Sequence, residues 1–278
     1  MNFKILWNDN RLHVGFTLCL VWLLNLWHFR ESGNIFPIIL YPLLAIAIIA
    51  ALDVGLTSLR YRKILGPHPA LRGRTASFAY LPTAAVVSGF LIGLILSPSE
   101  PFYVILTAAI LTSISKHFLA AGVRQHIFNP AAFGIMGVYF ILGTTVSWWG
   151  IAWSHSPLII LIPLMVRILL RLKRLFLPVG FLVIYGIYLL IFNPVEFALR
   201  TIIDPTVLMF ALVMLPEPMT SPAVGNFKYL FGALVVILAI LISNFASISE
   251  ILLPALLTAN LLSFIYLKYK LRPKSVVG

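Results

Sequence analysis

The chain has 278 residues, and its composition is that of a protein embedded in a lipid bilayer. Hydrophobic residues make up 61%, charged residues 10%, and the mean hydropathy is +1.02, whereas soluble domains contain about 25% charged residues. The formal net charge is +12. In a bilayer protein such basic residues lie in loops that face anionic lipid, so we expect membrane lipid as a partner and exclude nucleic acid. A single cysteine, Cys19, excludes a disulfide or a four-thiolate iron–sulfur cluster within one chain.

Runs of apolar residues predict about ten transmembrane helices. A spanning helix needs about 20 mainly apolar residues. Runs that meet or approach this length lie at residues 12–29, 36–58, 79–97, 101–119, 130–147, 156–171, 175–193, 204–215, 228–246 and 250–267. The short run at 204–215 predicts either a half-helix or a helix that extends back through Phe197 and Leu199. The expected fold is an all-α integral membrane protein that forms one transmembrane domain over residues 1–278.

The distribution of Lys and Arg predicts the orientation of these helices, because cytoplasmic loops carry the excess of positive charge. With ten spans and a cytoplasmic N-terminus, only Arg30 and Arg200 among the 20 basic residues fall outside. One missed or extra helix would move the basic residues that follow it to the opposite side of the membrane, so this division also supports the number of helices. We predict a multi-pass protein of the plasma (inner) membrane with both termini in the cytoplasm. The first run lacks a clear small-residue cleavage site, which favours a retained helix over a signal peptide.

Two pairs of segments, each pair separated by five helices, indicate an inverted repeat. The pairs are ILSPSEP at 95–101 with VMLPEPMTSP at 213–222, and IFNPAAFG at 127–134 with ILLPALL at 251–257. An odd number of spans in each half places the second half upside down, as in many transport folds. The expected halves are residues 1–150 and 151–278. Chance similarity is the alternative, because the chain contains 18 prolines.

The segment RQHIFNPAAFG, residues 124–134, is the strongest local signal. Asn129 is a good helix cap, and Pro130 suits the first helical position. The small residues that follow allow another backbone or a flat ligand to approach closely. A helix start at membrane depth favours an anionic or carbonyl group. An ordinary capped and tightly packed helix is the alternative.

The second signal is LPEPMTSP, residues 215–222, where three prolines exclude regular helix. Thr220 and Ser221 supply hydroxyl groups beside Pro222. At membrane depth such irregular backbone must be buried in protein or line a cavity; at the surface it is merely a rigid loop. Glu217 lies in an otherwise positive loop, where we expect it to be solvated.

Asp53 is the one acid well inside a predicted span. Such acids are read as functional by default, although its place near the helix end, about seven residues before Arg60, also allows a structural ion pair or a solvated vestibule. Asp204 precedes Pro205 and predicts a simple helix cap. Trp148, with the neighbouring Trp149 and Trp153, predicts an aromatic belt at the outer membrane interface.

These motifs, together with SGFLIGLILSPSEP and TSISKHFLA, resemble the family of flavin-carrying membrane subunits shared by the sodium-pumping NADH:quinone oxidoreductase and the Rnf electron-transport complex. The resemblance covers about residues 40–265. It implies a pseudo-symmetric bundle of ten helices, similar to urea transporters, that carries a flavin and passes electrons across the membrane.

Carried over to this chain, the resemblance points to two groups of flavin-binding residues and one candidate for an ion path. The first group is Arg124, His126, Asn129 and Pro130; the second is Pro218, Thr220, Ser221 and Pro222; the ion-path candidate is Asp53. The family attaches FMN to a threonine in an SGAT-like motif, which the loop LGTTVSWWGIAWSHSP lacks despite Thr144 and Thr145. The resemblance with this departure implies a non-covalent flavin, either FMN or riboflavin.

The leading hypothesis is therefore a flavin-dependent membrane subunit of an oxidoreductase complex, with electron transfer coupled to cation transport as an open extension. Its expected partners are a cytoplasmic reductase linked to NAD(P)H or ferredoxin and an extracytoplasmic flavoprotein or other electron-transport subunits. The alternative from another class is a cofactor-free channel or secondary transporter for a small solute or ion. A scaffold subunit that only docks partners is a third possibility.

Overall fold

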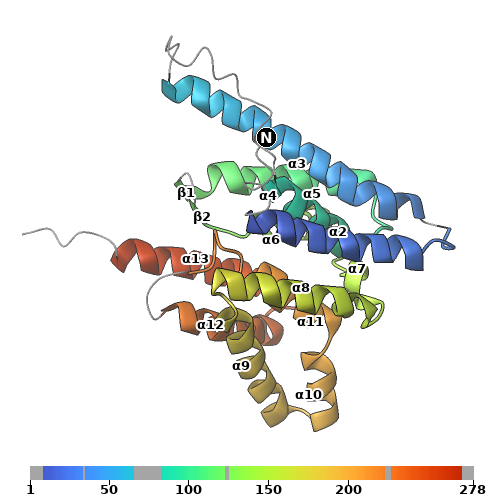
Figure 1. Ribbon diagram of the computed structural model, residues 1–278. Coiled ribbons are helices and arrows are strands. Elements are labelled where there is room, and N and C mark those ends of the chain that lie inside the picture. Colours follow the sequence, from blue (N-terminus) through green and yellow to red (C-terminus); the bar gives the residue numbers. More distant parts are fainter. Residues whose placement is uncertain (1–8, 34, 66–82, 123–124, 223–226, 271–278) are drawn as a thin grey trace, which may run out of the picture.

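The computed structural model describes residues 9–33, 35–65, 83–122, 125–222 and 227–270 of the chain (Figure 1). Most of these residues are helical. The described part of the N-terminal half contains α2 (Asn10–His28), α3 (Ile35–Leu65), α4 (Thr83–Ile95), α5 (Phe102–Phe118), the strands β1 (Ala120–Gly122) and β2 (Gln125–His126), and α6 (Pro130–Leu142). The two strands pair antiparallel between α5 and α6.

The C-terminal half alternates long helices with short ones. It contains α7 (Trp149–Ala152), α8 (Ser156–Leu172), α9 (Phe176–Phe192), α10 (Val195–Ile202), α11 (Pro205–Met209), the π-helix η2 (Phe210–Met214), α12 (Phe227–Phe245) and α13 (Leu252–Lys270). Helix α8 ends at Leu172, and the next residue, Lys173, adopts the left-handed conformation. This turn reverses the chain, and α9 bends away from α8 by 120° (Figure 1).

Each of the ten predicted apolar intervals contains a helix, but the region around 204–215 differs in detail. A separate helix, α10, precedes it, and α10 meets the continuous α11 and η2 at an angle of 45°. The break has a local cause, because Asp204 accepts a hydrogen bond from the Thr206 amide and Pro205 occupies the first helical position. Helix α7 is an additional short element that the hydropathy pattern does not predict.

Two helices of the described chain are long and apolar enough to cross a membrane. They are residues Ile35–Leu59 of α3 and the whole of α12. The bent pairs α8 with α9 and α10 with α11 and η2 add two more candidates if each pair is one span. The predicted all-α character is therefore confirmed in the described residues, and the length and composition of these helices are compatible with a membrane protein.

The helices pack at short distances around one core that draws on both halves of the chain. Helix α3 packs on α4 and α5, α2 packs on α4 and α8, and α9 packs on α12. Glycine makes the α3–α4 contact possible. A Cβ at Gly89 would lie 2.6 Å from the backbone nitrogen of Ile46, and one at Gly93 would lie 2.6 Å from the Pro42 Cα.

The two ends of the bundle carry different charges, and we name them by that difference. The basic end holds the starts of α2 and α6 and the ends of α5, α8 and η2; its described basic residues include Arg11, Lys116, Arg171, Lys173 and Arg174. The acidic end holds the starts of α11 and α13 and the loop between α6 and α7, with the acids Glu100, Asp204 and Glu250.

Candidate functional site

The start of α6 lies at the basic end, next to the end of η2. Asn129 is 3% exposed, and its Oδ1 accepts a hydrogen bond of 3.1 Å from the Ala132 amide, with Pro130 at the first helical position. The predicted helix cap is thus present. Its Nδ2 donates a 3.3 Å hydrogen bond to the carbonyl oxygen of Met214, the last residue of η2. One side chain therefore connects the two segments that carry the sequence motifs.

The segment 215–222 continues η2 as a series of turns, as its prolines predict. The Ser221 hydroxyl donates to the Glu217 carbonyl at 2.6 Å, and the Thr220 hydroxyl donates to a Glu217 carboxylate oxygen at 3.2 Å. Both hydroxyl groups that the sequence offers to a ligand thus hold the segment in shape. Pro222 is buried and Pro218 is exposed.

Arg174 fastens this segment to the turn between α8 and α9. Its guanidinium donates to the Ser221 hydroxyl at 2.6 Å and to the carbonyl oxygens of Ser221 and Pro218 at 3.4 Å each. Arg174 is 8% exposed. Burial lowers the pKa of the guanidinium, and the negative charge of Glu217 opposes that shift. A buried cation that makes three hydrogen bonds to this segment fixes the position of the whole turn.

Glu217 is partly buried, so the expectation of a fully solvated acid is wrong. Burial raises the pKa of its carboxyl to about 7, against the opposing effects of Arg11, the Thr220 hydrogen bond, Lys116 and Arg174. Three cations, Arg11, Lys116 and Arg174, lie near enough to lower the pKa of this carboxyl, but burial has the larger effect.

His126 lies on β2, three residues before the α6 cap. Burial lowers its pKa to about 4, and the charges of Lys116, Arg11 and His117 contribute in the same direction. The imidazole is therefore neutral at pH 7. Its Nδ1 is buried without a hydrogen-bond partner. Arg124, the remaining residue of this motif, lies outside the described residues.

Asp53 pairs with two residues of α5. Its carboxylate, in a residue 5% exposed, forms an ion pair with Lys116 and a 2.8 Å contact with His117 Nε2. Removing one partner of such a buried pair would leave the other charge without compensation, which is costly. The pairing joins Asp53 in α3 to the C-terminal end of α5.

The small residues after Pro130 serve helix packing. A Cβ added at Gly134 would overlap the Thr112 hydroxyl and the Ala108 carbonyl of α5. Ala131 and Ala132 are 2% and 0% exposed. The α5 backbone, which the sequence could not identify, is the partner that these residues admit.

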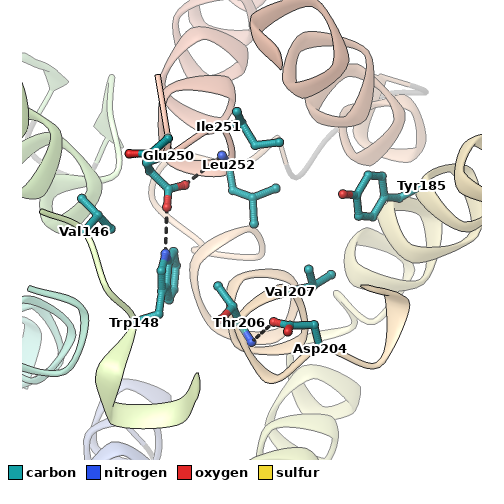
Figure 2. Close-up of a pocket in the computed structure, with 10 residues that line it drawn as sticks. Val146, Trp148, Tyr185, Asp204, Thr206, Val207, Glu250, Ile251 and Leu252 are labelled. Atoms are coloured by element: carbon teal, nitrogen blue, oxygen red, sulfur yellow. Dashed lines mark hydrogen bonds between the residues drawn. The ribbon is translucent and has the colours of Figure 1, made fainter. Parts of the chain in front are cut away.

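An open pocket of about 300 Å³ lies at the acidic end (Figure 2). Asp204, Tyr185 and Glu250 contribute polar groups to its lining, and Trp148 contributes an indole ring. Trp148 is 4% exposed, and its Nε1 donates to Glu250 Oε2 at 2.8 Å. The prediction that Trp148 belongs to a surface aromatic belt is therefore wrong, because the indole is buried against a carboxylate.

Sequence reasoning missed Arg174, Glu250 and the hydrogen bond between Trp148 and Glu250. Arg174 stands among several basic residues that satisfy the positive-inside rule equally well, so no local signal separates it from Lys173. Glu250 lies two residues before the first residue of α13, and an acid just before an apolar helix is the signal that could have revealed it.

The chain matches no family model and no curated protein sequence.

Proposed function

We propose that the chain is a membrane-embedded subunit of an electron-transport complex of the Rnf or sodium-pumping NADH:quinone oxidoreductase type. It holds a non-covalent flavin, FMN or riboflavin, at the start of α6 and exchanges electrons with neighbouring subunits on both sides of the plasma (inner) membrane. The observation that carries the proposal is the Asn129 Nδ2 hydrogen bond to Met214, which brings the two resemblance motifs together.

One buried polar group at this point is available to the polar edge of a flavin ring. His126 offers a buried Nδ1 without a partner, on a neutral imidazole that can donate or accept. The α6 start supplies the positive end of a helix dipole. A bound flavin would supply one- and two-electron transfer. Thr220 and Ser221 would act indirectly, since their hydroxyls hold the backbone of 215–222.

The helix contacts support the inverted repeat that belongs to this proposal. Helices α3, α5 and α6 pack in sequence as α9, α12 and α13 do, and α2 contacts α4 as α8 contacts η2. The pairs α2 with α8 and α6 with α13 also touch each other, as elements related by a two-fold axis would. Ten spans with both termini in the cytoplasm would place the basic end inside.

The helix starts support the same relationship. Asn129 at the start of α6 bonds to the end of η2. Glu250 at the start of α13 bonds to Trp148, whose backbone amide donates to the Ile95 carbonyl at the end of α4 at 3.0 Å. In each half, a capping side chain at a helix start thus bonds to, or near, the end of a helix from the other half.

The test is the flavin content of detergent-purified protein. Visible spectra are recorded before and after denaturation and filtration, and the filtrate is identified by mass spectrometry. We expect flavin in the filtrate of the wild type and little in Asn129→Leu or Thr220→Val, with both variants still folded by size-exclusion chromatography. Flavin retained by both variants would refute the site, and flavin retained by the polypeptide would refute non-covalent binding.

Two matched variants control for the chemistry of the substitutions. Asn244→Leu makes the same change at an exposed position near the end of α12, and Thr258→Val makes it at an exposed position of α13. Both should keep the flavin of the wild type. A flavin-free wild type, expressed with flavin available, would remove the electron-transfer proposal.

The second candidate is a cofactor-free channel or secondary transporter. The pocket at the acidic end favours it, because two carboxyl residues line an opening beside the starts of two helices. Solute uptake into vesicles by the flavin-free protein would distinguish this function from electron transfer.

A further inference from the structure

Lys228 at the start of α12 holds its ammonium group over two aromatic rings. The Nζ atom lies 4.8 Å from the centre of the Tyr229 ring and 5.7 Å from the centre of the Phe176 ring in α9. The centres of the two rings are 5.1 Å apart. Both distances from the ammonium suit a cation–π interaction. An ammonium has three N–H donors, so this contact restricts its position and leaves donors for an anion.

Lys173 adds a second positive charge close by. It is exposed in the turn between α8 and α9, three residues before Phe176. All eight Asp and Glu residues of the chain lie at described positions. The ion pairs among the described residues include neither Lys173 nor Lys228. In the described part of the chain, these two cations therefore have no carboxylate partner.

Helix α9 continues from these cations as an exposed apolar stripe with a notch in it. Gly180 lies one turn after Phe176, and a Cβ added there would meet only the Tyr229 carbonyl oxygen, at 3.8 Å. Val183 and Ile187 follow on the same face of the helix and are 52% and 51% exposed. Helix α12 packs beside α9 (Figure 1). The stripe therefore begins at the aromatic rings and leads away from the basic end.

The stripe has about the length of one bilayer leaflet. From Phe176 to Ile187 the helix rises about 16 Å, and one leaflet contributes about 15 Å of hydrocarbon, half of the bilayer core. A phosphate at the basic end would therefore place an acyl chain along the stripe. The positive-inside rule accounts for cations at this end, but it does not require one that is held over two rings beside a notch.

We propose that Lys228, Lys173 and the α9 stripe bind one anionic phospholipid of the adjoining leaflet. Its phosphate would contact the Lys228 ammonium, Lys173 would add charge, and an acyl chain would occupy the notch at Gly180. Charge complementarity favours a headgroup with a net negative charge, because a choline group would bring a third positive charge to the two lysines. The site requires only that the bundle lies in a bilayer, so it stands or falls separately from the proposed flavin.

The test is native mass spectrometry of the detergent-purified, delipidated full chain with added lipid. Phosphatidylglycerol and phosphatidylcholine with identical acyl chains are titrated separately, because both contain the phosphate and they differ in net charge. We expect one phosphatidylglycerol to bind at least about fivefold more tightly than phosphatidylcholine. Equal affinities would overturn the proposal. An excess of inorganic phosphate should leave the lipid bound, and displacement would indicate a free-anion site and overturn the lipid proposal.

Two variants connect the binding to the site. Lys228→Gln removes the charge held over the rings and should lower the affinity for phosphatidylglycerol about fivefold. Gly180→Leu fills the notch and should weaken the binding of both lipids; its Cβ has room in the structure. Both positions are only partly buried, and size-exclusion chromatography verifies folding. Unchanged affinity for phosphatidylglycerol in both variants would also overturn the proposal.

Each variant has a matched control. Arg30→Gln removes another cation that lies over a ring, 4.3 Å from the centre of Trp27, but beyond the end of α2 that lies away from the basic end. Gly55→Leu makes the same change as Gly180→Leu at an exposed position of α3 with no atom within 4 Å of an added Cβ. Both controls should bind phosphatidylglycerol as the wild type does. An equal loss of affinity in the controls would overturn the assignment to α9 and α12.

Discussion

The side-chain amide of Asn129 donates to the carbonyl oxygen of Met214, 85 residues later in the chain. The same side chain caps α6 through the Ala132 amide. A single residue therefore completes a local structure and holds together two segments from different halves. Position 129 thus couples the stability of α6 to the geometry of the 215–222 segment.

Replacing Asn129 with leucine should remove both bonds. The cap contributes about 1 kcal/mol, and a buried carbonyl without a partner costs about 1 to 3 kcal/mol. We expect a clear fall in the melting temperature of the detergent-purified protein. Asn129→Asp keeps the cap but lacks the donor to Met214, so its melting temperature should lie between those of the wild type and Asn129→Leu. A melting temperature for Asn129→Asp equal to that of the wild type would show that the Met214 bond contributes nothing.

The buried pair of Asp53 and Lys116 gives a second prediction. Asp53→Asn leaves the Lys116 ammonium buried without its counter-ion, which costs about 3 to 5 kcal/mol. The double variant Asp53→Asn with Lys116→Met removes both charges and should recover part of that loss. A melting temperature of the double variant below that of Asp53→Asn would contradict a structural pair. Changed ion dependence of electron transfer in reconstituted Asp53→Asn would instead place Asp53 on an ion path.

The raised pKa of Glu217 predicts a pH effect of unusual sign. Its carboxyl has a pKa of about 7 in the folded protein against an ordinary value of 4.5, so the folded state binds more protons between these pH values. Its contribution to stability is present below pH 4.5 and is lost as the pH rises to about 7. As the pH rises across this interval, the melting temperature of Glu217→Gln should therefore rise relative to that of the wild type. The exposed control Glu31→Gln should show no such trend.

His126 predicts the opposite slope. Its pKa is about 4 in the folded protein against 6.5, so the unfolded chain binds the extra proton first as the pH falls. The stability that the neutral imidazole contributes is lost between pH 6.5 and about 4. His126→Gln should flatten this part of the melting curve against pH. His155→Gln, at an exposed position, should leave the slope unchanged.

Local features of the sequence predicted local structure. The caps at Asn129 and Asp204 are present because a capping side chain bonds within three residues of itself. The partner of Asp53 could not be found in this way, since Lys116 comes from another helix 63 residues away. Tryptophan is enriched at membrane interfaces. The Trp148 indole, however, is bonded to Glu250, which lies 102 residues later in the chain. Long-range pairing of this kind leaves no periodic signal.

Two glycines in different surroundings test how tightly the helices are packed. Gly134 faces the α5 backbone, so an added methyl group must displace a carbonyl group or a helix. Gly55 in α3 is exposed and has no atom within 4 Å of an added Cβ. Gly134→Ala should therefore lose about 1 to 3 kcal/mol, whereas Gly55→Ala should gain about 0.5 to 1 kcal/mol from helix propensity. Thermal unfolding of the two variants side by side measures the difference. Equal melting temperatures would mean that α5 and α6 do not meet at Gly134.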